Sequence, residues 1–116
     1  MNYKADDYRP LIYICSPFAG EVEHNVQRAR AYSRFAVAQG VVPIAPHLLF
    51  PQFMDDEDAV SRAHALYMGL LILRHCAELW YFGNRITSGM SAEIEEAARR
   101  GIKTRHFNEN CVEVTE

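Results

Sequence analysis

The chain has 116 residues, a formal net charge of −3 at pH 7 and 49% hydrophobic residues. This length suits one domain with a single core, and the composition is typical of a folded protein rather than a disordered one. The negative charge gives little general attraction to nucleic-acid backbones or anionic membranes. We therefore expect one domain over residues 1–116 that binds neither nucleic-acid polymers nor membranes.

The cysteine and histidine spacings predict neither a metal site nor a disulfide framework. Cys15, Cys76 and Cys111 are odd in number and include no Cys-x-x-Cys pair, and the five histidines form no His-Glu-x-x-His motif. Residues 1–7 carry acids where a secretion signal needs positive and then apolar residues, and the longest apolar run, 65–73, is about half the length of a membrane span. We expect a soluble, cytoplasmic protein without a bound metal.

The first half of the chain predicts a strand, a helix and a second strand. Residues 11–15 (Leu-Ile-Tyr-Ile-Cys) are a continuous apolar run closed by Ser16 and Pro17, typical of a strand buried on both faces. Helically spaced apolar and small residues predict a helix over 25–39 that ends at Gly40. Residues 41–46 predict another strand, which its prolines place at a sheet edge or limit at its ends.

The second half continues the alternation. Residues 48–57 mix aromatic and acidic side chains without a period, which predicts a loop that could cover a site. A helix is predicted over 58–74, a buried strand over 78–82 before Gly83, and a helix over about 90–100. A weaker strand is predicted over 102–107, and the tail after 108 could add an edge strand or fray.

Alternating strands and helices favour an α/β fold, a three-layer sandwich with a four- to five-stranded, mostly parallel sheet. The loop over 16–21 lacks the Gly-x-Gly-x-x-Gly spacing of dinucleotide-binding folds, so an NAD-dependent dehydrogenase is disfavoured and we expect no cofactor. Open sheets of this kind bind ligands at the carboxyl ends of their strands.

Glu93 is the carboxylate that stands out in the helix after the third predicted strand. We expect exposed i,i+4 ion pairs between Glu95 and Arg99 and between Glu96 and Arg100, whereas Glu93 has no basic residue four positions on. If the helix starts near residue 90, Glu93 lies in its first turn. It could then complement the helix dipole, or it could serve as a charged nucleophile.

Three segments together resemble the nucleoside 2-deoxyribosyltransferase-like superfamily, including a branch of small proteins often met in phages and prophages. They are 13–18 (Tyr-Ile-Cys-Ser-Pro-Phe), 46–50 (Pro-His-Leu-Leu-Phe), and 79–83 (Leu-Trp-Tyr-Phe-Gly) running into 88–94 (Ser-Gly-Met-Ser-Ala-Glu-Ile). The match spans roughly residues 10–107. It implies a Rossmann-like or flavodoxin-like deoxyribosyltransferase fold.

The resemblance also implies a chemistry. In characterised enzymes of the superfamily a Gly, three residues and a nucleophilic Glu start this helix, and Gly89 and Glu93 match that spacing. Glu93 would attack the anomeric carbon of a nucleoside or nucleoside 5′-monophosphate, and another base or water would resolve the glycosyl ester with retention. The helix N-terminus would help to keep the carboxylate ionised. The alternative is a non-catalytic nucleotide-binding module that senses or sequesters its ligand; a purely structural protein is disfavoured by the polar loop.

Further residues follow from the same resemblance. His47, past the second strand, is a candidate for protonating the leaving base, or else a surface or capping histidine. Tyr13 and Ser16 would lie beneath the sugar, with Pro17 and Phe18 completing this substrate-binding segment, although Tyr13 could equally be a core residue.

Asp55 and Asp56 could reach the base from the covering loop, or they could simply be solvated.

The loop before Glu93 departs from the transferases, which often carry an Asp where this chain has Thr87. In related nucleotide hydrolases a Ser of this loop contacts the 5′-phosphate. Thr87 and Ser88, with the amides of Gly89 and Met90, could form such an anion site, or the hydroxyls could cap the helix. Arg28 on the first helix could add a phosphate contact, or it could be an ordinary exposed arginine. A phosphorylated substrate is favoured slightly over a free nucleoside.

Characterised relatives often complete the pocket from a neighbouring subunit, so we expect a homodimer or a higher homo-oligomer. Phe50, Phe53 and Met54 could line the interface, as could Trp80, which otherwise belongs to the core.

Overall fold

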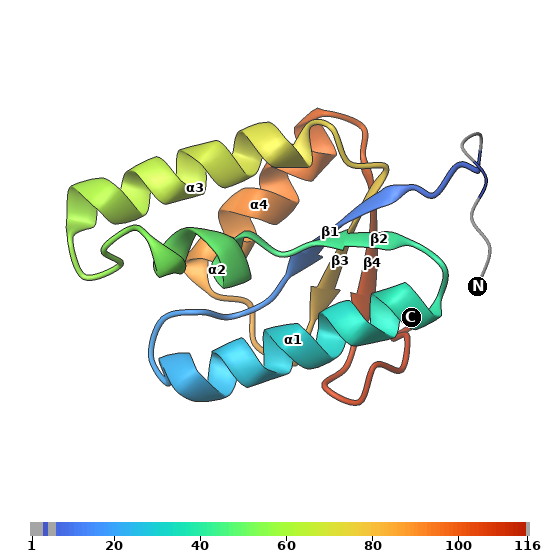
Figure 1. Ribbon diagram of the computed structural model, residues 1–116, viewed down its shortest axis with the longest axis horizontal. Coiled ribbons are helices and arrows are strands. Elements are labelled where there is room, and N and C mark those ends of the chain that lie inside the picture. The colour runs from blue at the N-terminus through green and yellow to red at the C-terminus, as the bar shows by residue number, and fades with distance from the viewer. Residues whose placement is uncertain (1–3, 5–6, 116) are drawn as a thin grey trace.

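The computed structural model describes residue 4 and residues 7–115, and it shows a central sheet between two layers of helices (Figure 1). In chain order the elements are β1 (Leu11–Cys15), α1 (Val22–Ala38), β2 (Val42–Ile44), α2 (Pro46–Leu49), the 3-10 turn η1 (Phe50–Gln52), α3 (Ala59–Leu73), β3 (Glu78–Phe82), α4 (Ser88–Arg99) and β4 (Lys103–Phe107). Most of the acidic segment 1–7, on which the expected cytoplasmic location partly rests, lies outside the described residues.

The sheet has four strands in the order β2-β1-β3-β4, and every pairing is parallel. The predicted α/β architecture is therefore confirmed. The two most apolar strands, β1 and β3, are central neighbours, with Ile14 opposite Trp80. β2 lies at an edge, where Pro43 can be accommodated because an edge strand has one side without a ladder partner.

Each face of the sheet has its own core, because side chains alternate along β1. Ile12 and Ile14 pack on the α1 side with Tyr32 and Phe82. Tyr13 and Cys15 point to the other side, where α3 and α4 contribute Leu73, Met90 and Ala97 to the core. The alternation therefore directs Tyr13 and Cys15 towards α4, the helix that carries Glu93.

The first helix begins at Val22, three residues before the predicted start at Asn25. Its N-cap residue, Glu21, makes no side-chain capping bond, so the usual start signal is missing. The Asn25 amide instead donates to the carbonyls of Phe18 (2.9 Å) and Ala19 (3.2 Å), and so holds the loop after β1 against the helix.

The prediction of a loop over 48–57 is wrong in its first half. α2 and η1 occupy 46–52. Pro46 is the first residue of α2 and Pro51 the second of η1, positions where a missing amide proton costs little. The tail after 108 forms neither a full strand nor a frayed end, but one antiparallel bridge between Phe107 and Glu113.

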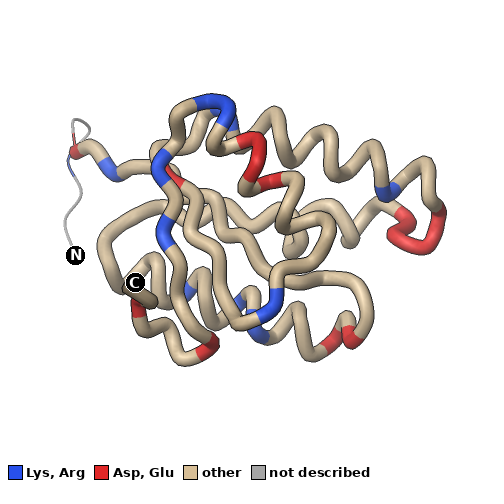
Figure 2. The backbone as a smooth tube through the Cα atoms, turned by 180° about the vertical axis from the view of Figure 1, so that it is seen from behind, with Lys and Arg blue, Asp and Glu red and all other residues tan. Residues whose placement is uncertain are grey.

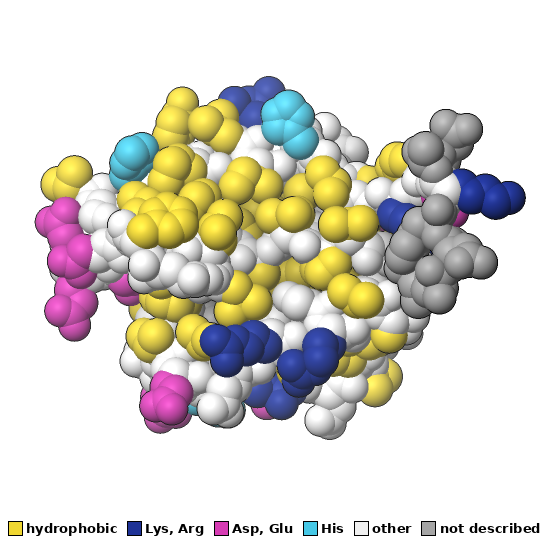
Figure 3. Space-filling model, viewed as in Figure 1, with side chains coloured by type: hydrophobic (Ala, Val, Ile, Leu, Met, Phe, Trp, Pro, Cys, Tyr) yellow, Lys and Arg dark blue, Asp and Glu magenta, His cyan; other side chains and the backbone are white. Residues whose placement is uncertain are grey.

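The surface is mixed in charge and apolar in one region. Basic and acidic residues are interspersed over several elements (Figure 2). Apolar side chains gather over α2 and α3 (Figure 3), where Phe53, Val60 and Tyr67 are 67%, 78% and 58% exposed. None of the described helices is long and apolar enough to cross a membrane.

Candidate active site

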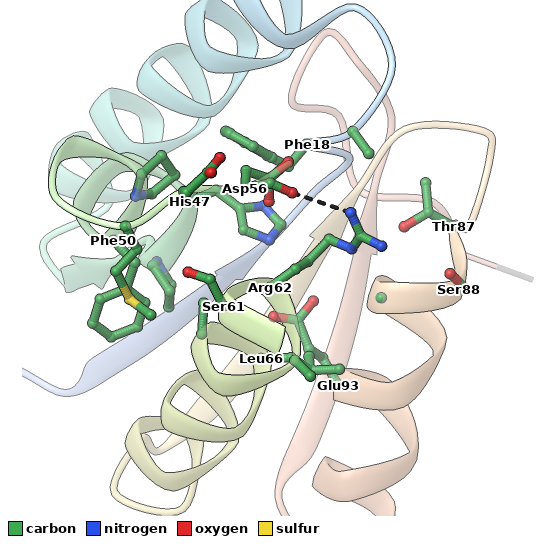
Figure 4. A pocket seen from close by; sticks show the side chains of 18 of the residues that line it. Phe18, His47, Phe50, Asp56, Ser61, Arg62, Leu66, Thr87, Ser88 and Glu93 are labelled. Carbon is green, nitrogen blue, oxygen red and sulfur yellow. Dashed lines mark hydrogen bonds between the residues drawn. The ribbon is translucent and has the colours of Figure 1, made fainter. Parts of the chain in front are cut away.

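A cavity of about 510 Å³ lies where β1, β2 and β3 end, between α3 and the start of α4 (Figure 4). Its walls come from Tyr13 on β1, the segment after β2, the first half of α3, and α4 with its preceding loop. This is the edge of the sheet at which open α/β folds bind ligands.

Glu93 lines this cavity although its side chain is almost completely buried, with 2% exposed. The Tyr13 hydroxyl donates a hydrogen bond to its Oε2 atom. The Cys15 thiol contacts its Oε1 atom at 3.4 Å. The two donors lie on the same face of β1, so the strand holds both oxygens of a carboxylate that comes from α4.

Tyr13 reaches Glu93 because α3 carries no side chain at Gly69. A Cβ atom at position 69 would lie 2.9 Å from the Tyr13 hydroxyl oxygen, closer than real Cβ atoms approach other atoms. The glycine thus leaves room for the tyrosine hydroxyl between α3 and α4.

Burial raises the pKa of Glu93 to about 7, against the opposing effect of the hydrogen bonds from Tyr13 and Cys15. The expectation that Glu93 lies in the first turn is wrong, since α4 begins at Ser88 and its first turn contains no acid. The helix-terminal field falls off within one turn, so at Glu93 the desolvation of the carboxylate outweighs it.

Glu96 is a second buried carboxylate of α4, rather than the exposed partner of Arg100 that the spacing predicts. It is 3% exposed and accepts hydrogen bonds from Arg74 (2.8 Å), Arg99 (2.5 Å) and Arg100 (3.0 Å). Arg99 thus pairs with Glu96 instead of Glu95. These three guanidinium groups lower the pKa of Glu96 to about 2.

His47 lies on α2 at the other side of the cavity, with its ring centroid 5.2 Å from that of Phe18. Burial lowers the pKa of His47 below its usual value, although the charge of Asp56 and a hydrogen bond with the Ser16 backbone act the other way. The imidazole is therefore mainly neutral at pH 7.

The structure brings most of the predicted site residues together. Those that line the cavity are Tyr13, Phe18, His47, Asp55, Thr87, Ser88, Gly89 and Glu93, together with Asp56. Thr87 also caps α4, because its Oγ1 accepts from the Met90 amide at 3.2 Å.

Four predicted residues do not line the cavity. Ser16 and Met90 are buried beside it, and Pro17 connects Ser16 to Phe18. Arg28 donates to the carbonyl of Glu109 in the C-terminal segment. Arg28 thus contacts the C-terminal segment and lies outside the cavity, away from the place of its predicted phosphate contact.

A family model described as Domain of unknown function (DUF7768) matches residues 10–107. The chain belongs to the DUF7768 family. Among solved structures, this DUF7768 domain is similar to a 2-deoxyribosyltransferase from the psychrotolerant bacterium Bacillus psychrosaccharolyticus, with a TM-score of 0.68 and 15% sequence identity over 84% of this chain and 72% of that chain. The likeness shows a deoxyribosyltransferase-type fold. A comparison with curated protein sequences finds no match.

The DUF7768 domain also places residues in the cavity that sequence reasoning missed. Arg62 of α3 is one, and its Nη1 atom donates to the Asp56 carbonyl at 3.1 Å. A sequence signal existed, because Arg62 is the only Lys or Arg between Arg34 and Arg74. Cys15 does not line the cavity but contacts Glu93, and it had no such signal, since this contact spans 78 positions.

Chemically, the cavity offers one buried carboxylate, a neutral imidazole, one guanidinium and several apolar side chains. Within residues 4 and 7–115, no three His, Cys, Asp or Glu side chains come together as a metal site requires. Once it is ionised, the buried carboxylate can act as a nucleophile.

Proposed function

We propose that this domain cleaves the N-glycosidic bond of a nucleoside or nucleoside 5′-monophosphate, by hydrolysis or by deoxyribosyl transfer, with Glu93 as the nucleophile. One observation carries the proposal: a buried carboxylate, held at both oxygens by donors from β1, faces a cavity at the ligand-binding edge of the sheet. The fold is that of a 2-deoxyribosyltransferase, which supports the assignment at the level of the fold.

In this mechanism a carboxylate oxygen of Glu93 forms a bond to the anomeric carbon. The glycosidic bond breaks, and its electron pair leaves with the base, which takes up a proton from solvent water. Water or a second base then attacks the same carbon and releases Glu93. Two displacements at one carbon retain its configuration.

The protonation states limit what His47 can do. Glu93 must be ionised to attack, and with its pKa at about 7 it is mostly ionised only above neutral pH. Because the pKa of His47 is lowered, the imidazole is neutral there. We therefore assign His47 a hydrogen bond to the base rather than the delivery of a proton from an imidazolium.

The decisive experiment measures base release by chromatography from a panel of nucleosides and 5′-monophosphates, with and without an acceptor base. Glu93→Gln keeps the shape of the side chain and removes the nucleophile, so release should fall by about 1,000-fold or more, to background. Glu95→Gln is the matched control, because Glu95 is exposed on the same helix. Release that persists unchanged in Glu93→Gln would refute the proposal.

The second candidate function is a non-catalytic nucleotide-binding module. The raised pKa of Glu93 favours it, because a carboxyl that is partly protonated at pH 7 can donate a hydrogen bond to a ligand. Thermal stabilisation by a nucleotide without base release, retained in Glu93→Gln, would establish this function instead.

A further inference from the structure

The cavity has two chemically different ends, with Glu93 between them. On one side are His47 and Phe50, and on the other are Thr87 and Ser88 of the loop that enters α4 (Figure 4). Phe18 and Met54 add apolar surface to the lining. A nucleotide has the same order of parts, with a flat base, a sugar and then a phosphate.

Arg62 brings a positive charge to the second end. Its side chain extends from α3 past Glu93, and its guanidinium points towards Thr87 and Ser88 (Figure 4). Among the described residues that line the cavity, it is the only Lys or Arg. One of its five N–H groups is used by the Asp56 carbonyl, which leaves others for a ligand.

Two acids of residues 48–57, the covering segment, also line the cavity: Asp55 and Asp56. Neither carboxylate forms an ion pair with the Arg62 guanidinium. The Asp55 Oδ1 atom accepts from the Glu57 amide at 2.9 Å, within its own turn. The carboxylate of Asp56 acts electrostatically on His47. Arg62 contacts Asp56 only through the backbone oxygen, a neutral acceptor that a phosphate would outmatch, because hydrogen bonds between two charged groups are shorter and stronger.

We propose that Arg62 binds the 5′-phosphate of the substrate, so that this site takes nucleoside 5′-monophosphates in preference to free nucleosides. The inference rests on the proposed function for the position of the sugar over Glu93. A planar guanidinium matches a phosphate through two parallel hydrogen bonds, and a free nucleoside leaves this group without its partner. The Ser88 hydroxyl lies on the same side and adds a neutral donor.

The test compares ligand affinities by calorimetry and needs no turnover. Each 2′-deoxynucleoside 5′-monophosphate, its nucleoside and inorganic phosphate are titrated into Glu93→Gln protein with Arg62 intact, Arg62→Met or Arg62→Lys. Arg62→Met should weaken binding of the monophosphate by about 10- to 100-fold and change nucleoside binding by less than about twofold. The monophosphate affinity of Arg62→Lys should lie between those of the proteins with Arg62 and with Arg62→Met, since lysine keeps the positive charge but lacks the planar pair of donors.

Arg34→Met is the matched control, because Arg34 is an exposed arginine on α1 outside the cavity. It should leave both affinities unchanged. Arg62 is itself exposed, so its variants should fold, which circular dichroism checks.

Each remaining outcome decides the question. If Arg62→Met weakens nucleoside and monophosphate equally, Arg62 only ties the covering segment to α3, and the inference fails. If neither affinity changes, or if no panel member binds the protein with Arg62 intact, it fails as well. If the preference for monophosphates depends on Arg62 but protein with Glu93 intact releases no base, the inference stands and the glycosidase proposal fails.

Discussion

At the scale of single residues, the two donors that hold Glu93 differ in strength. A phenol hydroxyl is a good hydrogen-bond donor, whereas a thiol is a weak one. Tyr13 therefore holds Oε2 firmly. Oε1, which faces Cys15 at 3.4 Å, loses less hydrogen-bond energy when it forms a new bond. Oε1 is the oxygen we expect to attack.

Base release should depend on pH through Glu93. The nucleophile acts when ionised and its pKa is about 7, so the rate should rise from pH 5, reach half of its maximum near pH 7 and level off above pH 8. Single-turnover rates across this range measure the curve. A rate that is flat from pH 5 to pH 9 would contradict the assignment of Glu93.

Tyr13→Phe should shift this curve upwards in pH. The substitution removes a hydrogen bond that lowers the pKa of Glu93, and burial then acts with less opposition. Loss of a bond to a charged group predicts a rate at pH 7 that is lower by about 3- to 10-fold, with less loss at pH 9. Cys15→Ser should move the curve the other way, because a hydroxyl is the better donor; equal losses at all pH values would indicate misfolding instead.

At the scale of elements, α3 approaches β1 closely at Gly69, beside the Tyr13 hydroxyl. Helix propensity alone favours alanine over glycine inside α3 by about 1 kcal/mol. Overlap of an alanine methyl group with the Tyr13 hydroxyl opposes this gain, since the tyrosine is buried and cannot move aside freely. The two effects can be separated because the overlap depends on a single oxygen atom.

Gly69→Ala should lower the free energy of unfolding by about 1–3 kcal/mol in the otherwise unchanged protein. In a Tyr13→Phe background the oxygen is absent, and the same substitution should be neutral or stabilising by up to about 1 kcal/mol. Urea unfolding of the four proteins of this double-mutant cycle measures the coupling. Additive effects would show that the overlap is relieved elsewhere.

At the scale of the whole molecule, the two buried carboxylates of α4 act oppositely on stability. The pKa of Glu96 is lowered to about 2, so its stabilising contribution is present above pH 4.5 and is lost as the pH falls towards 2. The pKa of Glu93 is raised to about 7, so its contribution is present below pH 4.5 and is lost as the pH rises through 7. The contribution of Glu93 to stability should therefore decline between pH 4.5 and pH 8, whereas His47, whose pKa is lowered, acts in the opposite direction only up to its ordinary value of 6.5.

Glu93→Gln should remove this decline. A shift from 4.5 to about 7 corresponds to a loss on the order of 3 kcal/mol in the free energy of unfolding between pH 4.5 and pH 8. The variant should be as stable as the unchanged protein at pH 4.5 and more stable at pH 8, by urea unfolding. The free energy of unfolding of Glu95→Gln should still decline over this range. If the free energies of Glu93→Gln and the unchanged protein change in parallel with pH, Glu93 is not the cause of the decline.

We also expect a homodimer or a higher homo-oligomer, and the exposed apolar side chains over α2 and α3 support this expectation. Light scattering after size exclusion measures the mass. Val60→Lys with Tyr67→Lys should shift the mass towards that of one chain, because both charges would enter the apolar surface. A single chain at all concentrations in the unchanged protein would contradict the prediction.

Much of the fold could be predicted because its signals are local. The apolar runs 11–15 and 78–82 mark the central strands, and apolar spacing marks the helices. Boundaries were missed where local signals were weak or misleading. α1 starts without a capping side chain, and the irregular mixture of aromatic and acidic residues over 48–57 hides the short helical turns of α2 and η1.

The amino-acid sequence by itself determined the α/β alternation and the central parallel sheet, and it singled out Glu93 through its missing ion-pair partner and the family resemblance. Tertiary structure decided what surrounds that carboxylate. Tyr13 and Cys15 are 80 and 78 positions from Glu93, and Arg74 is 22 from Glu96. Such contacts depend on how strands and helices pack across the sheet, which no local pattern encodes, and only packing removes water from Glu93 and so sets its pKa.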